Sequence, residues 1–342
     1  IEFQRQYGLD GFLINLPGRP AHWKDYIASM EATGGGEKLI WKSGLETWVP
    51  SDDNPHTFLA GRQPLPRADY QTVDPESPAT FRIPGYVWNT WHAPSLWDIS
   101  EDADLVDAAA YPDWFTGGLQ IARAACPDVS VHVEVFSPFT HLVELFGYEQ
   151  GLMALIDVPE ICYRLLSLFA EQVIAQVGRY AECEPDAILI SSAFAGAGFI
   201  GRDMYREFVV PYEKRVVHAI GKYNIPSYVH TCGAIGDRLD LMAETDVDGI
   251  DTLDPPPLGT VDLAQAKSEF GRRFFFKGNL DAVNEMLAAD DEVFARAVRQ
   301  RLEIGKPGSG YILSSACSVA PHVKSQRLKM MVDLADQFGR YS

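Results

Sequence analysis

The chain has 342 residues, of which 46% are hydrophobic, and its formal net charge is -18, from 29 basic and 47 acidic residues. Such an acidic chain is unsuited to bind nucleic acid or an anionic membrane, and no uninterrupted apolar run is long enough to span a bilayer. The five cysteines are an odd number without disulfide-like spacing, which indicates reduced thiols and a cytoplasmic protein. The sequence starts at Ile1 rather than Met, so a preceding N-terminal segment is expected.

The first hundred residues show little sustained periodicity. A short helix-like piece, the apolar run 11–16 and an amphipathic piece at 22–34 resemble a first barrel unit. Ser43-Gly44 separates two apolar segments and predicts a two-residue hairpin. We predict that residues 37–97, with this hairpin and a long Pro-rich loop, form an insertion that covers the active-site face as a lid.

The predicted insertion is rich in aromatic side chains. They can form a wall around an organic ligand or pin a long loop to the barrel, and packing is the commoner role of such rings. The residues are Trp41, Trp48, Tyr86, Trp88, Trp91 and Trp97.

From residue 100 onward, helical and strand patterns alternate. Short β-rich apolar runs predict strands at 129–136, 186–191, 225–230, 248–253, 272–278 and 310–315. Helical patterns lie between them, at 101–110, 113–126, 138–157, 159–181, 202–223, 235–245, 262–270, 281–304 and 323–338. Strict alternation with buried strands favours a parallel sheet, and this many repeats favour an α/β fold of the (β/α)8 TIM-barrel type. We therefore expect residues 1–342 to form one barrel domain.

Polar side chains gather at or just after the carboxyl ends of the predicted strands. This is the face on which barrel enzymes build their active sites. The residues are Glu134, Ser191, Ser192, His230, Cys232, Asp251, Asp254, Asn279 and Cys317.

Three of these residues form a candidate metal site. On extended backbone His230 and Cys232 point to the same side, and Cys317 follows another strand of the same face. Thiolate and imidazole ligands suit Zn²⁺, and three such ligands are typical of a catalytic zinc with an open fourth position. A water, a substrate atom or a carboxylate can fill that position. Asp254 is the first choice and Glu134 the second, and both are candidate catalytic groups.

The two carboxylates also have structural interpretations. Asp254 precedes three prolines and is equally well explained as a turn residue. Glu134 stands among apolar strand residues, where burial would raise its pKa unless a cation pairs with it, and its structural interpretation is a buried carboxylate bonded to backbone.

A glycine motif follows the strand at 186–191. Gly196, Gly198 and Gly201 fit G-x-G-x-x-G between a strand and a helix, the context of dinucleotide binding. That fingerprint needs an acidic residue at the end of the next strand, which here ends in His-Thr-Cys. The motif therefore indicates a barrel loop whose glycines allow close approach to a ligand or partner. Gly196, Gly198 and the strand-end Asn279 are the candidate cofactor-binding residues.

From about Val129 to the C-terminus the chain resembles the uroporphyrinogen decarboxylase superfamily, in its barrel order and in the pieces FSPFTHLVELFG, FVVPYEKRVV, KGNLD and GYILSSAC. His-x-Cys-Gly followed by a distant Cys looks like the zinc-dependent methyltransferase branch, which includes methylcobalamin:coenzyme M methyltransferases and the methyltransferases of corrinoid-dependent demethylation. The resemblance implies that His230, Cys232 and Cys317 bind zinc and that a partner protein supplies a corrinoid (cobalamin). Cobalamin-independent methionine synthase is similar too, and its acidic ligand one strand later favours Asp254.

Two features of the decarboxylases are not found in this sequence. Their N-terminal arginine-rich motif is absent from these residues, and Ala316-Cys317 replaces a strand-end His-Gly. We therefore expect a zinc-dependent methyltransferase that moves a methyl group between a small molecule (a methyl ether, a methylamine or a thiol) and a protein-bound corrinoid. The alternatives are a decarboxylase-like barrel without metal and a non-catalytic metal-binding barrel. Whether the protein is a monomer or a homodimer stays open.

Overall fold

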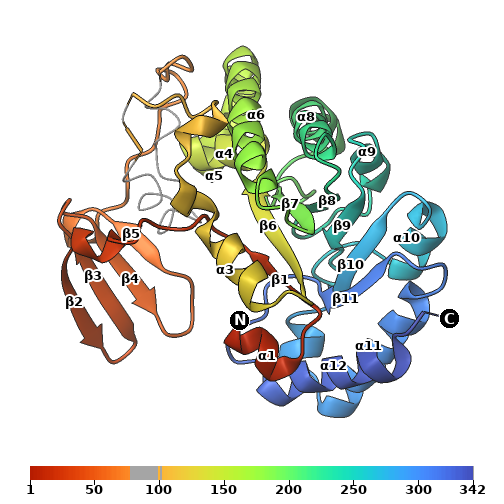
Figure 1. Ribbon diagram of the computed structural model, residues 1–342. Helices are drawn as coiled ribbons and strands as arrows, with labels where there is room; N and C mark the ends of the chain where they lie inside the picture. Colours follow the sequence, from red (N-terminus) through yellow and green to blue (C-terminus); the bar gives the residue numbers. More distant parts are fainter. Residues whose placement is uncertain (78–98, 101, 342) are drawn as a thin grey trace.

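The computed structural model describes residues 1–77, 99–100 and 102–341 (Figure 1). Its main sheet has seven parallel strands in the order β1-β6-β7-β8-β9-β10-β11. The strands are β1 (Gly11–Ile14), β6 (Ser130–Phe136), β7 (Ala187–Ser191), β8 (Ser227–His230), β9 (Gly249–Thr252), β10 (Phe275–Leu280) and β11 (Tyr311–Ser315). The sheet curls into a half barrel with helices on its outer face, an α/β arrangement consistent with a TIM-type barrel. The six strands predicted after residue 128 are confirmed.

Helices connect the successive strands and cover the outside of the sheet. They are α1 (Glu2–Tyr7), α3 (Gly117–Ala125), α4 (Pro138–Phe146), α5 (Tyr148–Asp157), α6 (Pro159–Ala181), α7 (Arg202–Phe208), α8 (Val210–Gly221), α9 (Leu239–Ala243), α10 (Leu263–Phe270), α11 (Asp291–Gly305) and α12 (Ser325–Phe338). The helix predicted at 101–110 is wrong: in the described part of this range, residues 102–110, the one helical element is the 3-10 turn η4 (Ala108–Ala110). Asp104 and Asp107 each accept a hydrogen bond from the backbone N–H two residues later, which favours turns over a helix.

Alternate strand residues face opposite sides of the sheet, and the two sides differ in chemistry. Ile188 and Ile190 of β7 pack outward in the main core between sheet and helices. Ala187 and Leu189 pack inward with Tyr228 inside the half barrel. The apolar residues on both faces explain why β7 is buried along its whole length. The same alternation decides which polar side chains can reach the barrel interior.

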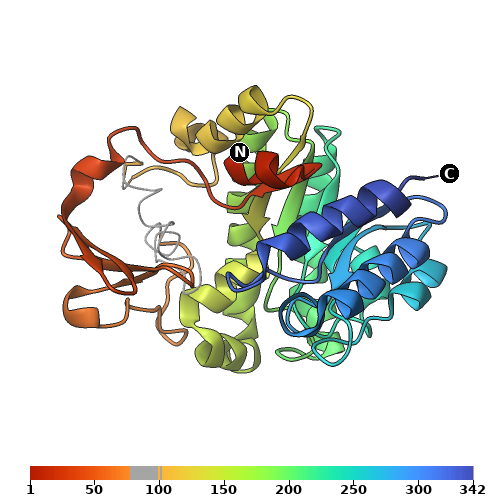
Figure 2. The ribbon, with the colours of Figure 1, turned by 90° about the horizontal axis from the view of Figure 1, so that it is seen from below.

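A second sheet lies beside the half barrel (Figures 1 and 2). It contains four antiparallel strands, β2 (Ile27–Thr33), β3 (Gly36–Trp41), β4 (Glu46–Pro50) and β5 (His56–Phe58). The sequence pattern predicts only a hairpin here and indicates that the amphipathic piece at 22–34 belongs to the barrel, whereas β2 lies within that piece. The sequence does not reveal β2 because six of its seven residues are exposed, so no buried face marks it as a strand.

The four-stranded antiparallel sheet therefore begins at Ile27, before the predicted start of the insertion at residue 37. Residues 78–97 of that insertion lie outside the described residues, as do Tyr86, Trp88, Trp91 and Trp97.

In the main sheet the two edge strands are β1 and β11, so the described residues form seven of the eight strands expected. A pocket of about 900 Å³ opens between them and is also lined by residues of α1 and α12. Its inner wall includes His132, Tyr228 and Lys277. In the part of the chain that the structure describes, no helix has the length and apolar character needed to cross a membrane.

Candidate metal centre

Three side chains meet at the carboxyl end of the main sheet. Nε2 of His230 lies 3.3 Å from Sγ of Cys232, which lies 3.9 Å from Sγ of Cys317. Among the described residues, these three form the one group of His, Cys, Asp or Glu side chains whose ligand atoms all lie within 4.8 Å of one another. Residues separated by 85 positions in the sequence are thus brought together, as predicted from the strand ends.

The spacing of these atoms fits a tetrahedral zinc ion. Bond lengths of about 2.3 Å to sulfur and about 2.0 Å to nitrogen, at tetrahedral angles, place two sulfur ligands about 3.8 Å apart and a nitrogen and a sulfur about 3.5 Å apart. The observed separations of 3.9 Å and 3.3 Å agree. Cys232 and Cys317 are half-buried free cysteines. The donor set is therefore suited to supply three of the four ligands of a tetrahedral zinc ion.

The local fold explains why the ligands converge. Tyr228 points into the half barrel, so His230, two residues later on β8, points the same way. The chain then turns at Gly233, whose φ of +76° favours glycine. The N–H of Gly233 donates to Oδ2 of Asp254 at 2.7 Å, which ties the loop carrying Cys232 to the end of β9. Cys317 lies two residues after the end of β11.

The second nitrogen of His230 has its own partners. Nδ1 lies 3.1 Å from Oδ2 of Asp251 and 2.8 Å from Oγ1 of Thr252. Lys277 donates to the other oxygen, Oδ1, of Asp251 at 2.8 Å. The sequence placed Asp251 near the site without a role and missed Thr252 and Lys277. A lysine inside the apolar run RRFFFKG was the available signal for Lys277.

The groups of the site perturb one another's protonation. Hydrogen bonds from Cys232 and His230 lower the pKa of Cys317, whereas the bond to Cys317, together with burial, raises the pKa of Cys232. Burial alone would lower the pKa of His230, but its contacts with Asp251 and Cys317 outweigh burial and raise it. Burial would likewise raise the pKa of Asp251, but the charge of Lys277 and the bond to His230 lower it to about 2. At neutral pH His230 and one of the two thiols therefore hold protons that a bound cation would displace.

The two carboxylates predicted as fourth ligand or catalytic group lie outside the three-residue group. Asp254 is 6% exposed, and burial raises its pKa although the Gly233 N–H opposes that shift. Glu134 is also 6% exposed and accepts a hydrogen bond from Nδ2 of Asn15 at 2.9 Å. Burial raises the pKa of Glu134, against hydrogen bonds from Ser191 and Asn15. Their roles as ligand or catalytic group stay predictions, and both are near enough for His230 to influence their pKa values.

The loop of Gly196 and Gly198 packs directly against the loop that carries the candidate ligand Cys232. A Cβ atom at Gly196 would lie 2.4 Å from the carbonyl oxygen of Cys232, so only glycine allows this approach. The next residue, Ala197, donates its N–H to the carbonyl of Ala234 at 2.8 Å. A Cβ at Gly198, by contrast, would meet nothing within 4 Å. Gly196 thus packs against the segment that carries a candidate ligand, and Gly198 faces open space.

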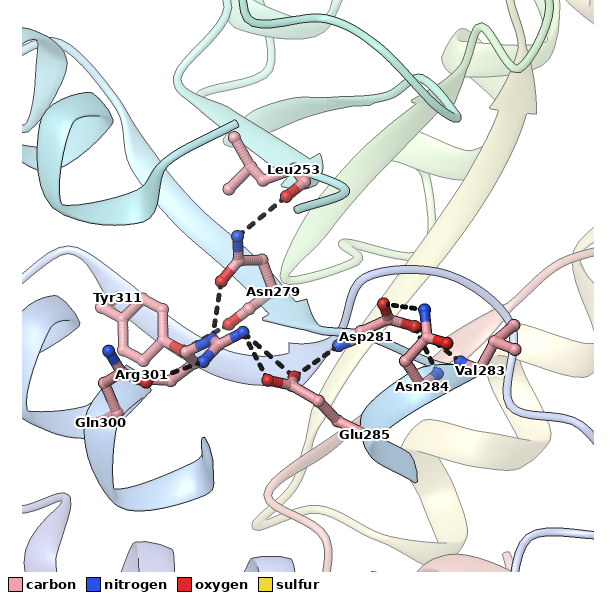
Figure 3. A network of polar contacts seen from close by, with 10 residues as sticks. Leu253, Asn279, Asp281, Val283, Asn284, Glu285, Gln300, Arg301 and Tyr311 are labelled. Atoms are coloured by element: carbon pink, nitrogen blue, oxygen red, sulfur yellow. Dashed lines mark hydrogen bonds and ion pairs between the residues drawn. The ribbon is translucent and has the colours of Figure 1, made fainter. Parts of the chain in front are cut away.

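Asn279 belongs to a polar network at the end of β10 (Figure 3). It is 1% exposed; its Nδ2 donates to the carbonyl of Leu253, and its Oδ1 accepts from Nε of Arg301 at 3.2 Å. Arg301 also holds Glu285 at 2.9 and 3.0 Å, and Glu285 accepts from the N–H of Asp281 at 2.8 Å. The amide of Asn279 is therefore engaged within the protein, where it joins the ends of β9 and β10. Its predicted cofactor contact stays a prediction.

Comparison with known proteins places the chain in a family. The uroporphyrinogen decarboxylase (URO-D) family model matches residues 99–338. Relatives include the uroporphyrinogen decarboxylase of Thioalkalivibrio sulfidiphilus, 28% identical over 191 residues, which are 54% of this chain and 51% of the relative. Another is the methylcobamide:CoM methyltransferase MtbA of Methanosarcina acetivorans, 27% identical over 179 residues, which are 52% of this chain and 50% of the relative. The chain spans about half the length of the curated relatives it matches.

Solved structures agree on the fold. A methyltransferase from Methanosarcina mazei superimposes with a TM-score of 0.65 at 15% identity, over 98% of this chain and 83% of that one. A B12-independent methionine synthase from Shewanella superimposes with a TM-score of 0.50 at 10% identity, over 98% and 84%. The family model covers well over half of the sequence. The chain therefore belongs to the uroporphyrinogen decarboxylase family.

Proposed function

We propose that this protein is a zinc-dependent methyltransferase that moves a methyl group between a small molecule and a corrinoid carried by a partner protein. The observation that supports it most strongly is the convergence of His230, Cys232 and Cys317 with atom separations suited to tetrahedral zinc. A relative named as a methylcobamide:CoM methyltransferase supports the same reaction class. Asp254 and Glu134 are the candidate carboxylates for the fourth position, and Gly196, Gly198 and Asn279 for contacts with the corrinoid.

The residues of the chain account for the parts of such a reaction that a protein supplies. When bound, zinc supplies Lewis acidity, which lowers the pKa of a thiol acceptor or polarises the oxygen or nitrogen of a methyl donor. His230, Cys232 and Cys317 would hold the ion, with the fourth position taken by that substrate atom, a water or one of the two candidate carboxylates. Asp254 fixes the loop of Cys232 through the Gly233 N–H. Partial burial of Cys232 and Cys317 would restrict the access of water to the reacting atoms.

Methyl transfer is tested with free methylcobalamin and coenzyme M as a thiol acceptor, because these stand in for the two substrate classes. Loss of the methylcobalamin absorption under anaerobic conditions reports transfer in wild type, in Cys317→Ala and in Cys183→Ala. Cys183 is a half-buried free cysteine outside the site and provides the matched control. We expect transfer by wild type and Cys183→Ala and none by a folded Cys317→Ala. An unfolded Cys317→Ala would favour a structural metal, and equal activity in all three would refute the proposal.

Decarboxylation is the second candidate because several relatives are named uroporphyrinogen decarboxylase. In that case the thiols of Cys232 and Cys317 would bind no metal and take no part in the reaction. Incubation with uroporphyrinogen and chromatography of the products distinguishes the two reactions. Carboxyl loss that a chelator leaves unchanged would support the decarboxylase and contradict the methyltransferase.

A further inference from the structure

Asp251 is a buried carboxylate next to the candidate ligand His230. It lies on β9, directly opposite His230 in the parallel register of β8 and β9. It is 4% exposed, and its two oxygens are used by different partners: Oδ2 faces Nδ1 of His230 at 3.1 Å, and Oδ1 faces Nζ of Lys277 at 2.8 Å. Lys277 in turn lies opposite Asp251 in the register of β9 and β10. The three residues therefore form a row across three neighbouring strands.

The geometry of the imidazole ring makes this row relevant to metal binding. Nε2 of His230 faces the sulfur of Cys232 at 3.3 Å, so this nitrogen is the one directed at the ligand cluster. A neutral imidazole coordinates through a nitrogen that carries no proton, so the proton must be on Nδ1. A carboxylate oxygen at Nδ1 accepts that proton's hydrogen bond and selects this tautomer. Thr252 can accept or donate, so its hydroxyl at 2.8 Å does not select a tautomer.

We infer that Asp251 is a positioning residue that fixes His230 with its proton on Nδ1 and Nε2 free for the metal, and that Lys277 fixes the orientation of Asp251. The inference rests on the proposed metal centre. It extends that proposal to two residues that do not touch the ion. Partners of this kind commonly contribute 10-fold to 100-fold in metal affinity.

The hydrogen-bond partners of Asp251 allow a test that distinguishes selection of the His230 tautomer from a purely structural role. An ammonium only donates hydrogen bonds, so in Asp251→Asn the amide oxygen turns toward Lys277 and the amide NH₂ toward Nδ1. Nδ1 must then accept, which places the proton on Nε2 and blocks coordination. In the double variant Asp251→Asn/Lys277→Met no ammonium fixes the amide, so its oxygen can turn to His230 and restore the competent tautomer.

The experiment measures the zinc dissociation constant by competition with a chromogenic chelator, together with the absorption of the Co²⁺-substituted protein. Asp246→Asn is the matched control, because Asp246 also pairs with a histidine, His218, at 2.9 Å. Asp246 lies before β9, and its side chain is 54% exposed. We expect about 10-fold to 100-fold weaker zinc binding in Asp251→Asn, partial recovery in the double variant, and a change below about twofold in Asp246→Asn.

The outcomes separate this inference from the proposed function. Wild type that binds no zinc contradicts both. Wild type that binds zinc, with Asp251→Asn unchanged or with no recovery in the double variant, overturns the positioning role and leaves the metal centre standing. If Asp251→Asn does not fold, ¹⁵N-histidine NMR of the zinc-loaded wild type decides instead: a proton on Nδ1 of His230 supports the inference, and metal on Nδ1 overturns it.

Discussion

Replacing the buried carboxyl group of Glu213 with an amide should stabilise the protein at alkaline pH much more than at acidic pH. Glu213 lies on α8 and is 1% exposed, and among the described residues neither of its oxygens has a hydrogen-bond partner. Burial raises its pKa to about 7 from 4.5, although the hydroxyl groups of Ser192 and Tyr205 are near enough to oppose the shift.

The direction follows from the two pKa values. The folded state binds this proton more tightly than the unfolded state does. The free energy of unfolding therefore falls as pH rises from 4.5 through about 7, and the loss is complete above that range. At about 1.4 kcal/mol per pH unit, the interval between 4.5 and about 7 corresponds to about 3 kcal/mol. The amide does not titrate, so Glu213→Gln lacks this loss.

The assay is urea unfolding of wild type and Glu213→Gln between pH 5 and pH 8.5, followed by circular dichroism and tryptophan fluorescence. The gain of the variant over wild type should grow by about 3 kcal/mol across this range, whatever its value at pH 5. Glu303→Gln, which makes the same change at an exposed position of α11, is the control for the effect of burial. A pH-independent difference for Glu213→Gln would refute the reasoning.

Three further predictions concern the polar network and the metal site. Arg301→Met should lower the unfolding free energy by about 3 kcal/mol because it leaves the carboxylate of Glu285 without its ion-pair partner. Lys329→Met, which breaks the exposed ion pair with Asp333, should lower it by less than about 1 kcal/mol. Equal losses in urea unfolding would contradict this prediction. Zinc binding at neutral pH should release about two protons. The raised pKa values of His230 and one thiol keep that imidazole and that thiol protonated before zinc binds. Zinc binds a neutral imidazole and thiolates, so both protons must leave. Calorimetry in buffers of different ionisation enthalpy counts these protons, and a count near zero would be inconsistent with this ligand set. Gly196→Ala should weaken zinc binding on the order of tenfold by displacing the loop of Cys232, and Gly198→Ala should leave zinc binding unchanged. Chelator competition measures the zinc dissociation constant of each variant. Identical constants would show that the contact between Gly196 and the carbonyl of Cys232 is unimportant for zinc binding.

Much of the barrel could be predicted from the sequence because its signals are local. Strands such as β7 are short, apolar on both faces and bounded by helical patterns, which single-sequence reasoning detects. The convergence of the three candidate metal ligands was also predictable, since residues after the ends of parallel strands gather on one face of a barrel. His230 and Cys317 meet for that reason.

The remaining features depend on information that one sequence does not carry. The pairing of His230, Asp251 and Lys277 follows from strand register, which fixes which residues lie opposite one another. The approach of Gly196 to the carbonyl of Cys232 depends on how two loops pack, and the glycine motif instead suggested a ligand contact. The exposed strand β2 lacks the buried face on which strand prediction relies.

The central claim is that His230, Cys232 and Cys317 hold a zinc ion, and elemental analysis tests it most directly. Wild type, Cys232→Ala and the control Cys183→Ala are treated with chelator, reconstituted with zinc under reducing conditions and desalted. We predict about one zinc per chain in wild type and in Cys183→Ala and essentially none in Cys232→Ala. No zinc in wild type, or an equal content in Cys232→Ala, would contradict the account.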